Sequence, residues 1–240
     1  MDVNQDYIDS QRLLYYSTLC FFRGKENLLV ESVRDEIFGD HSAKLLEFSG
    51  EFVTVWIKKL DWDTSYFKCP TFKIEFIGWK PDITDPRLQI SRLLETIKDE
   101  LKLKYQRYYL FTEVPSEDIT VLQSLGMAEM QLIETRLTYF FDLTEMSLPS
   151  ELPLVRIAQS SDISNLRKVA KESRNNYDRF HADPFFSTEI ADEFLAEYVE
   201  QCVKGLVDVV LVPSWDDEVP DAFICGAKNI DKGKIGSVGR

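Results

Sequence analysis

Residues 173–187 gather the side chains best suited to acid–base chemistry and to binding a charged substrate. The segment reads S-R-N-N-Y-D-R-F-H-A-D-P-F-F-S. It contains His181, one of only two histidines in the chain. Because imidazole is the side chain that most readily exchanges protons near neutral pH, His181 is a candidate general base or substrate-contact residue. A purely structural or solvent-facing histidine is the alternative.

Charged neighbours extend this candidate site. Arg179 carries a planar guanidinium that can hold a diphosphate through two parallel, charge-assisted hydrogen bonds. An ion pair with Asp178, Asp183 or Glu189 would use the same guanidinium, and the sequence does not separate the two roles. The candidate substrate-binding residues are Arg174, Tyr177, Arg179, His181 and Asp183.

Three phenylalanines, Phe180, Phe185 and Phe186, share the segment with these polar side chains. Loops held by rigid elements often carry function, so exposed aromatic rings there would favour a binding surface. The alternative is a surface loop whose phenylalanines fill the core beneath it.

Two predicted helices must position this loop. Before it, Ile163, Leu166, Val169 and Ala170 recur at helical spacing behind a cap at Ser160, Ser161 or Asp162. After it, a helix from Thr188 to Lys204 ends at Gly205. Its predicted inward residues are Ile190, Ala191, Phe194, Leu195, Tyr198, Val199 and Cys202. The predicted strands of this half are 154–157, 207–212, 222–227 and one beginning at Ile235.

The preceding half has its own alternation of elements. Strands are predicted over 52–57, 72–76 and 108–114, with a helix over 88–101 and turns over 60–67. Ser116 is the predicted cap of a helix with Ile119, Leu122 and Leu125 inside and Gly126 at its end. One or two strands follow in 128–143. The sequence thus predicts an α/β fold of the α+β type with a mixed sheet, in domains 1–148 and 149–240, and leaves residues 1–50 unassigned.

Composition narrows the class of protein. The chain has a net charge of −13, whereas nucleic-acid binding needs a basic surface. We therefore expect no nucleic-acid partner. No apolar run approaches the ~18 residues of a membrane-spanning helix, and the acidic amino terminus does not resemble a signal peptide. Cys202 and Cys225 are expected to be buried free thiols, and without a C-x-x-C motif we expect no metal site. We therefore expect a cytoplasmic protein without a membrane partner.

The order of strand, helix, helix, strand, hairpin and strand after residue 150 resembles the front half of the GNAT N-acetyltransferases. More closely, the chain resembles the nucleotide-aminosugar acetyltransferases typified by TDP-fucosamine acetyltransferase. Leu60–Phe67 resembles that family's L-x-W-[DE]-[ST]-x-F-F segment, and Leu122–Met127 its L-Q-x-L-G-F segment. Tyr177–Phe186 is similar to its S-R-F-x-A/x-D-P-x-[FY] loop. The likeness runs from about residue 50 to the end.

The resemblance implies a degenerate half-GNAT domain followed by the front half of a true one. It implies transfer of an acetyl group from acetyl-CoA to an amine, most plausibly of a TDP-linked 4-amino-deoxy sugar. The small-molecule acceptor would bind at the 177–186 loop. The alternative is a non-catalytic binding or interaction module that retains only the acceptor half.

The chain departs from the family pattern at the motif that binds the cofactor. GNAT enzymes grip the pyrophosphate of coenzyme A with an R/Q-x-x-G-x-G/A loop at a helix start, and we expect that loop beyond Arg240. The glycines of 233–240 have no helix after them. A sheet edge at 235–240 also predicts a homodimer, because unpaired strand edges invite pairing.

Overall fold

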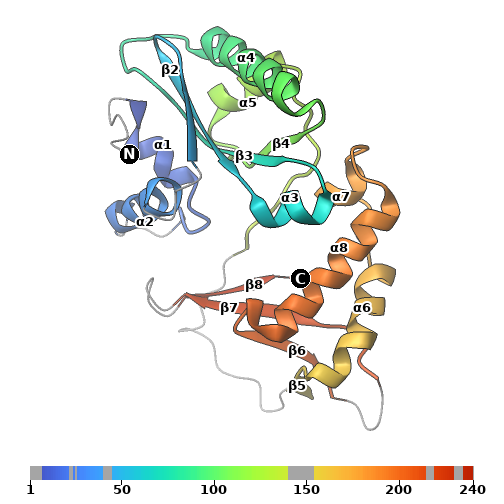
Figure 1. Cartoon of the computed structure of the whole chain (residues 1–240). Helices are drawn as coiled ribbons and strands as arrows, with labels where there is room; N and C mark the ends of the chain where they lie inside the picture. The colour runs from blue at the N-terminus through green and yellow to red at the C-terminus, as the bar shows by residue number, and fades with distance from the viewer. Residues whose placement is uncertain are drawn as a thin grey trace. The chain divides into compact units, whose positions relative to one another are not determined.

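The chain divides into two compact units, Met1–Leu132 and Ile133–Arg240. The computed structural model describes residues 7–21, 24, 26–39, 45–139, 154–214, 219–229 and 235–239 (Figure 1). The domain boundary predicted between residues 148 and 149 lies outside these described residues. Each unit contains a four-stranded sheet and helices, so the fold is mixed α/β as predicted.

The first unit is built on a mixed sheet of order β1-β2-β3-β4. Strands β1 to β3 are antiparallel, whereas β4 runs parallel to β3 and is reached through the crossover helix α4. The elements are α1 Ser10–Tyr15, α2 Glu26–Phe38, β1 Leu45–Ser49, β2 Val53–Lys59, α3 Asp61–Phe67, β3 Thr71–Trp79, α4 Arg87–Tyr105, β4 Tyr109–Thr112 and α5 Ile119–Met127.

Helices cover both faces of this sheet. On one face, Val55 and Ile74 pack with Ile90 and Leu94 of α4 and with α5. On the other, Trp56 and Phe76 of the strands pack with residues of α1 and α2, including Leu13, Val33 and Ile37. The apolar residues of β2 and β3 are therefore buried on both faces of the sheet.

Several predictions for this unit were wrong. Residues 61–67 form helix α3 rather than turns, because Asp61 and Asp63 favour a helical first turn and Lys68 ends it with a left-handed backbone (φ 49°). Asp118, not Ser116, caps α5 by accepting from the Val121 backbone N–H. Ile119 is exposed, while Val121 takes the inner position.

Residues 1–50 had no predicted elements, and the prediction for residues 128–143 differs from the structure. Residues 1–50, left unassigned, supply α1, α2 and β1 within their described part. Residues 128–139 contain no strand, contrary to prediction, and residues 140–143 lie outside the described part of the chain. The strands over 53–59, 71–79 and 109–112 and the helix over 87–105 confirm the other predictions.

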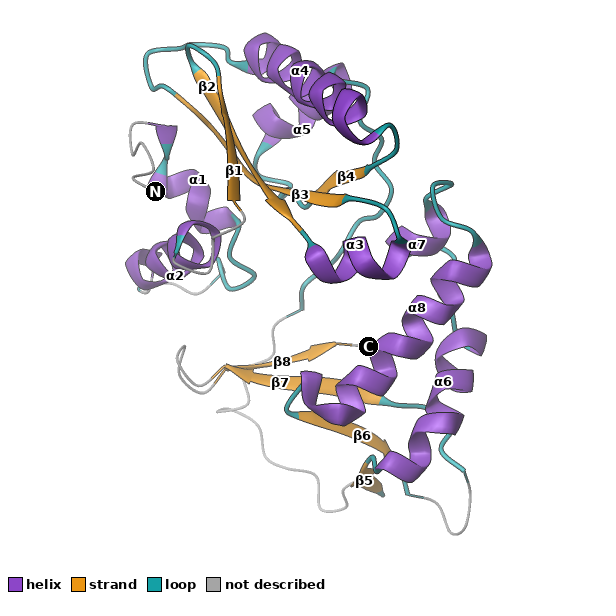
Figure 2. Ribbon diagram, in the orientation of Figure 1, coloured by secondary structure: helices purple, strands orange, loops and turns teal. Residues whose placement is uncertain are grey.

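The second unit is an antiparallel sheet of order β5-β6-β7-β8 with helices α6 and α8 side by side (Figure 2). Leu166 and Ala170 of α6, Val199 of α8 and Val212 of β6 form its core. Its elements are β5 Val155–Ile157, the 3-10 turn η4 Ser160–Asp162, α6 Ile163–Glu172, α7 Arg179–Ala182, α8 Thr188–Gln201, the π-helical turn η5 Cys202–Leu206, β6 Val209–Pro213, β7 Ile224–Asn229 and β8 Ile235–Gly239.

Local signals explain the ends of these helices. Gln159 and Asp162 form a reciprocal capping box at η4, one residue before the predicted caps. Ser187 caps α8. Gly205 ends the helical run with φ 110°, and this end was predicted. Ile190 was predicted to face inward but is exposed, because the inner face of α8 is set by Ala191, Phe194 and Val199.

The other face of this sheet carries an apolar row. Ile157, Leu211 and Ile224 lie opposite one another across β5, β6 and β7. Ile157 is 65% exposed and Ile224 is 52% exposed. Among the described residues, α6 and α8 pack against the opposite face, where Val210, Val212 and Cys225 are buried. No helix in the described part of the chain is long and apolar enough to cross a bilayer.

Candidate functional site

The loop between α6 and α8 is organised by Asp178. Its Oδ1 accepts hydrogen bonds from the backbone N–H groups of Phe180 (2.9 Å) and His181 (3.0 Å), so it caps the short helix α7. Aspartate is a favoured N-cap residue because it satisfies amide groups that have no partner within the helix. The loop therefore contains a fixed turn of helix rather than an irregular excursion.

His181 lies between two carboxylates. Its Nδ1 is 2.8 Å from Oδ2 of Asp178, and its Nε2 is 3.0 Å from Oδ1 of Asp192 on α8. The side chain of His181 is only 3% exposed. Only the doubly protonated imidazolium can donate to both carboxylates at once. In this arrangement neither ring nitrogen is open to take a proton from a substrate.

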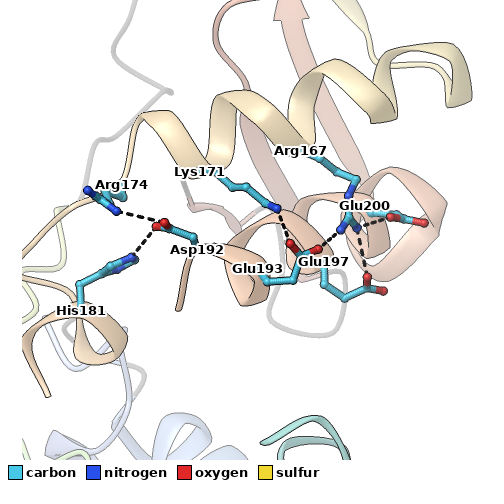
Figure 3. A network of polar contacts seen from close by, with 8 residues as sticks. All are labelled: Arg167, Lys171, Arg174, His181, Asp192, Glu193, Glu197 and Glu200. Atoms are coloured by element: carbon cyan, nitrogen blue, oxygen red, sulfur yellow. Dashed lines mark hydrogen bonds and ion pairs between the residues drawn. The ribbon is translucent and has the colours of Figure 1, made fainter. Parts of the chain in front are cut away.

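Asp192 also joins His181 to Arg174. Nη1 of Arg174 donates to Oδ2 of Asp192 at 3.0 Å, while the arginine side chain stays 42% exposed (Figure 3). Burial of Asp192 raises its pKa, but the hydrogen bonds from His181 and Arg174 outweigh burial and leave the pKa lowered. Asp192 thus accepts hydrogen bonds from two side chains, one inside the fold and one at its surface.

The remaining predicted site residues separate into buried and exposed groups. Asp183 accepts from the Phe185 backbone N–H at 2.8 Å and so shapes the loop. The guanidinium of Arg179 lies 4.5 Å above the ring of Phe180, a cation–π contact. Tyr177 is 82% exposed. Of the five predicted residues, Arg174 and Tyr177 present the most side-chain surface to solvent.

The loop's phenylalanines mainly fill the core. Phe180 is buried with its ring centroid 4.2 Å from that of Phe194 on α8, and Phe186 packs edge-on against Phe180 at 5.4 Å. Phe185 in turn contacts Phe186 at 5.1 Å. This packing supports the alternative in which the aromatic residues anchor the loop onto α8.

A second group of charges continues along α6 and α8. Arg167 contacts Glu193, Glu197 at 3.1 Å and Glu200 at 2.5 Å. Lys171 also pairs with Glu193 (Figure 3). The three glutamates recur at four- and three-residue spacing and therefore face α6 together. Sequence reasoning missed this ladder.

An open hollow of about 500 Å³ lies along α6 and is lined by Ser160, Ile163, Ser164, Arg167, Lys168 and Lys171. Two of its three cations, Arg167 and Lys171, are neutralised by glutamates of α8. The hollow consequently has little positive charge left with which to hold an anion. Within the described residues, no group of three or more His, Cys, Asp or Glu could hold a metal ion.

The described residues do not fit the pyrophosphate of coenzyme A. Residues 235–239 form β8, and its ladder with β7 runs from Asn229↔Ile235 to Cys225↔Gly239. A phosphate cradle needs consecutive backbone N–H groups at the start of a helix, which this strand does not offer. Gly236 and Gly239 are therefore residues of strand β8.

Part of this site was accessible from the sequence. Asp178, three residues before His181, carries the signal of an N-cap that sequence reasoning could have assigned. Asp192 carries no such signal, because its contact with His181 depends on how α7 packs on α8.

A scan against protein-family models finds no match for the chain, and a search of curated proteins finds no match either.

Proposed function

We propose that the chain supplies the acceptor-binding part of a GNAT-type N-acetyltransferase that acts on the amine of a nucleotide-linked aminodeoxy sugar. The observation that supports this proposal is the second unit's order of β5, α6, α8, β6, β7 and β8 in one antiparallel sheet. That order matches the one that the sequence resemblance implies. The helices α6 and α8 share one face, and the polar loop between them is the expected acceptor side.

The proposal assigns acceptor contacts to the exposed residues of the loop. Arg174 uses one donor on Asp192 and has further donors for a diphosphate. Tyr177, largely exposed, offers a ring on which a nucleoside base can stack. His181 and Asp183 hold the loop in shape and act as positioning residues.

Acetyl transfer requires a neutral amine aligned with the acetyl donor. Acetyl-CoA supplies that group in the family that the chain resembles. The described residues provide no cradle for its pyrophosphate, and both ring nitrogens of His181 are engaged, so we derive no step of the transfer through them. The proposed contribution of this part of the chain is to bind and orient the acceptor.

Binding of the acceptor tests the proposal directly. A TDP-linked 4-amino-deoxy sugar should bind the full chain with saturable heat in calorimetry, and Arg174→Gln should weaken binding about tenfold, the loss of roughly one charge-assisted contact. Lys168→Gln, which removes an exposed cation of the neighbouring helix, should leave the affinity unchanged. Equal weakening by both variants would reduce the effect to overall charge. No binding of the sugar would contradict the proposal.

A non-catalytic binding or interaction module is the second candidate. Two observations favour it: both ring nitrogens of His181 are hydrogen-bonded, and residues 235–239 pair with β7 as a strand. Calorimetry with acetyl-CoA and an acetylation assay separate the two. Heat from acetyl-CoA or an acetylated product supports the transferase. Their absence together with sugar binding supports the module.

A further inference from the structure

Two of the four cysteines meet in the core of the second unit. Cys202 is the first residue of η5, directly after α8, and Cys225 lies in β7 opposite Val210 of β6. Both are free thiols, 2% and 3% exposed, and they share one buried cluster with Val210. Their side chains also interact with each other, which shifts the pKa of both thiols. The two sulfur atoms are neighbours even though 22 residues separate them in the sequence.

A third polar group belongs to this pair. Tyr198 lies one helical turn before Cys202, on the same side of the helix. Burial, and then the neighbouring Cys202, raise the pKa of Tyr198, so its hydroxyl remains a donor. The tyrosine itself is partly exposed. A line of three polarisable groups thus leads from the surface of α8 to Cys225.

The two thiols are not equivalent. The hydrogen bond from Cys225 lowers the pKa of Cys202 against the opposing effect of burial, and Tyr198 lowers it further. The same pairing raises the pKa of Cys225, as does its burial. Because the thiolate is the reactive form of cysteine, Cys202 is the better nucleophile of the two.

The backbone at Cys202 departs from regular α-helix. Here the α-helix changes to the π-helical turn η5, which ends near Gly205 with its left-handed φ of 110°. Such π-turns are local irregularities that often accompany function. Shortening a thiol contact to the S–S bond of about 2.05 Å requires a small movement.

We infer that Cys202 and Cys225 form a redox-active pair that a hydroperoxide converts reversibly into a disulfide. The Cys202 sulfur attacks the O–O bond, which gives a sulfenic acid at Cys202 and releases the alcohol, or water from hydrogen peroxide. The Cys225 sulfur then attacks the Cys202 sulfur, expels water and closes the S–S bond. The two thiols lose two electrons and two protons, and the peroxide is reduced. A dithiol reductant reverses the change.

Mass spectrometry of the full chain tests this inference. The reduced chain is treated with hydrogen peroxide under native conditions, its remaining thiols are blocked with N-ethylmaleimide, and it is digested without reduction. We expect a single cross-linked peptide joining Cys202 to Cys225, a loss of about 2 Da before blocking, and full reversal by dithiothreitol. Two of the four thiols should remain titratable.

Serine variants identify the order of attack. Cys225→Ser should trap a sulfenic acid on Cys202 as its dimedone adduct, whereas Cys202→Ser should give little adduct on Cys225. Cys69→Ser removes another buried thiol and should leave the cross-link unchanged. Retention of four thiols by the native oxidised wild-type chain, or a disulfide joining any other pair, would overturn the inference. The wild-type measurement decides the question even if a serine variant does not fold.

Discussion

At the scale of single residues, His181 is a buried imidazole with two acidic partners. Asp178 and Asp192 each take one ring nitrogen, and Arg174 balances the charge of Asp192 from the surface. Removing one member of a buried charge set leaves the others without compensation, which generally costs more than the intact set contributes. We therefore expect the contacts of His181 with Asp178 and Asp192 to hold α7 against α8, although Arg174 is exposed.

We expect His181→Ala to lower the free energy of unfolding by about 2–4 kcal/mol, because two facing carboxylates lose their shared donor. Chemical denaturation monitored by circular dichroism measures this loss. Lys168→Ala, which truncates an exposed side chain on α6, should change stability by less than about 0.5 kcal/mol. A tolerated His181→Ala would show that the carboxylates rearrange to reach water.

Asp162 gives the second unit a predictable response to acid. Nη1 and Nη2 of Arg156 donate to its two oxygens at 2.7 and 2.8 Å, and the Gln159 backbone N–H donates at 2.7 Å. The hydrogen bonds from Arg156 lower the pKa of Asp162 despite its burial. Stabilisation from a lowered carboxyl pKa is complete above the unfolded value of about 3.9 and is lost as the pH falls through the lower folded value.

Asp162→Asn should therefore destabilise the chain by about 1–2 kcal/mol at neutral pH and by progressively less below about pH 4. Urea unfolding at a series of pH values measures the difference from the wild type. Asp221→Asn, an exposed carboxyl on the same unit, is the matched control and should show no such pH dependence. A constant difference across the series would assign the effect to packing instead of ionisation.

At the scale of elements, the second unit is joined by contacts between α6 and α8. Leu166 and Val199 supply the apolar part, and Arg167 with its three glutamates supplies the polar part. The helix α8 also needs a defined end, since η5 must turn the chain back into β6. Gly205 makes that turn with a φ that residues with a Cβ rarely adopt.

A pair of glycine substitutions separates backbone conformation from side-chain space. Neither Gly205 nor Gly126 has an atom within 4 Å of an added Cβ, but only Gly205 has a positive φ. Gly205→Ala should cost about 1–3 kcal/mol through backbone strain. Gly126→Ala, in α5, should stabilise by about 0.5–1 kcal/mol through helix propensity. Denaturant midpoints measure both, and equal signs would contradict the conformational explanation.

At the scale of the whole molecule, the two sheets differ in how they are covered. The first has α4 and α5 on one face and α1 and α2 on the other. The second packs α6 and α8 on one face and presents Ile157, Leu211 and Ile224 on the other within the described residues. Its outermost strands there are β5 and β8. An apolar row between two strand edges favours association.

We accordingly predict self-association that increases with concentration, through the face of the second sheet that carries Ile157, Leu211 and Ile224. Light scattering coupled to size-exclusion chromatography over a wide range of loading concentrations measures it. Because the chain carries a net charge of −13, added salt should strengthen the association by screening repulsion. A monodisperse monomer at every concentration and ionic strength would contradict the prediction.

The sequence by itself determined the elements with a strong period or an unambiguous stop. The apolar spacing of α4, α6 and α8, the β-branched and aromatic runs of β2 and β3, and Gly205 at the end of α8 are local signals, and local physics suffices to interpret them. The same reasoning failed for α3, whose aromatic and acidic residues resemble a turn, and for the first fifty residues, where α1 has only 6 residues. The helicity of α1 and α2 depends on packing against the sheet.

Only the tertiary structure decided the role of the candidate site. From its residue type, His181 was a candidate for proton transfer, with a structural or solvent-facing position as the alternative. The packing of α7 on α8 brings Asp192 to its second ring nitrogen and leaves Arg174 and Tyr177 at the surface. The contact of Cys202 with Cys225 arises in the same way, from a helix end meeting a strand. Such contacts join residues distant in sequence, so no local pattern encodes them.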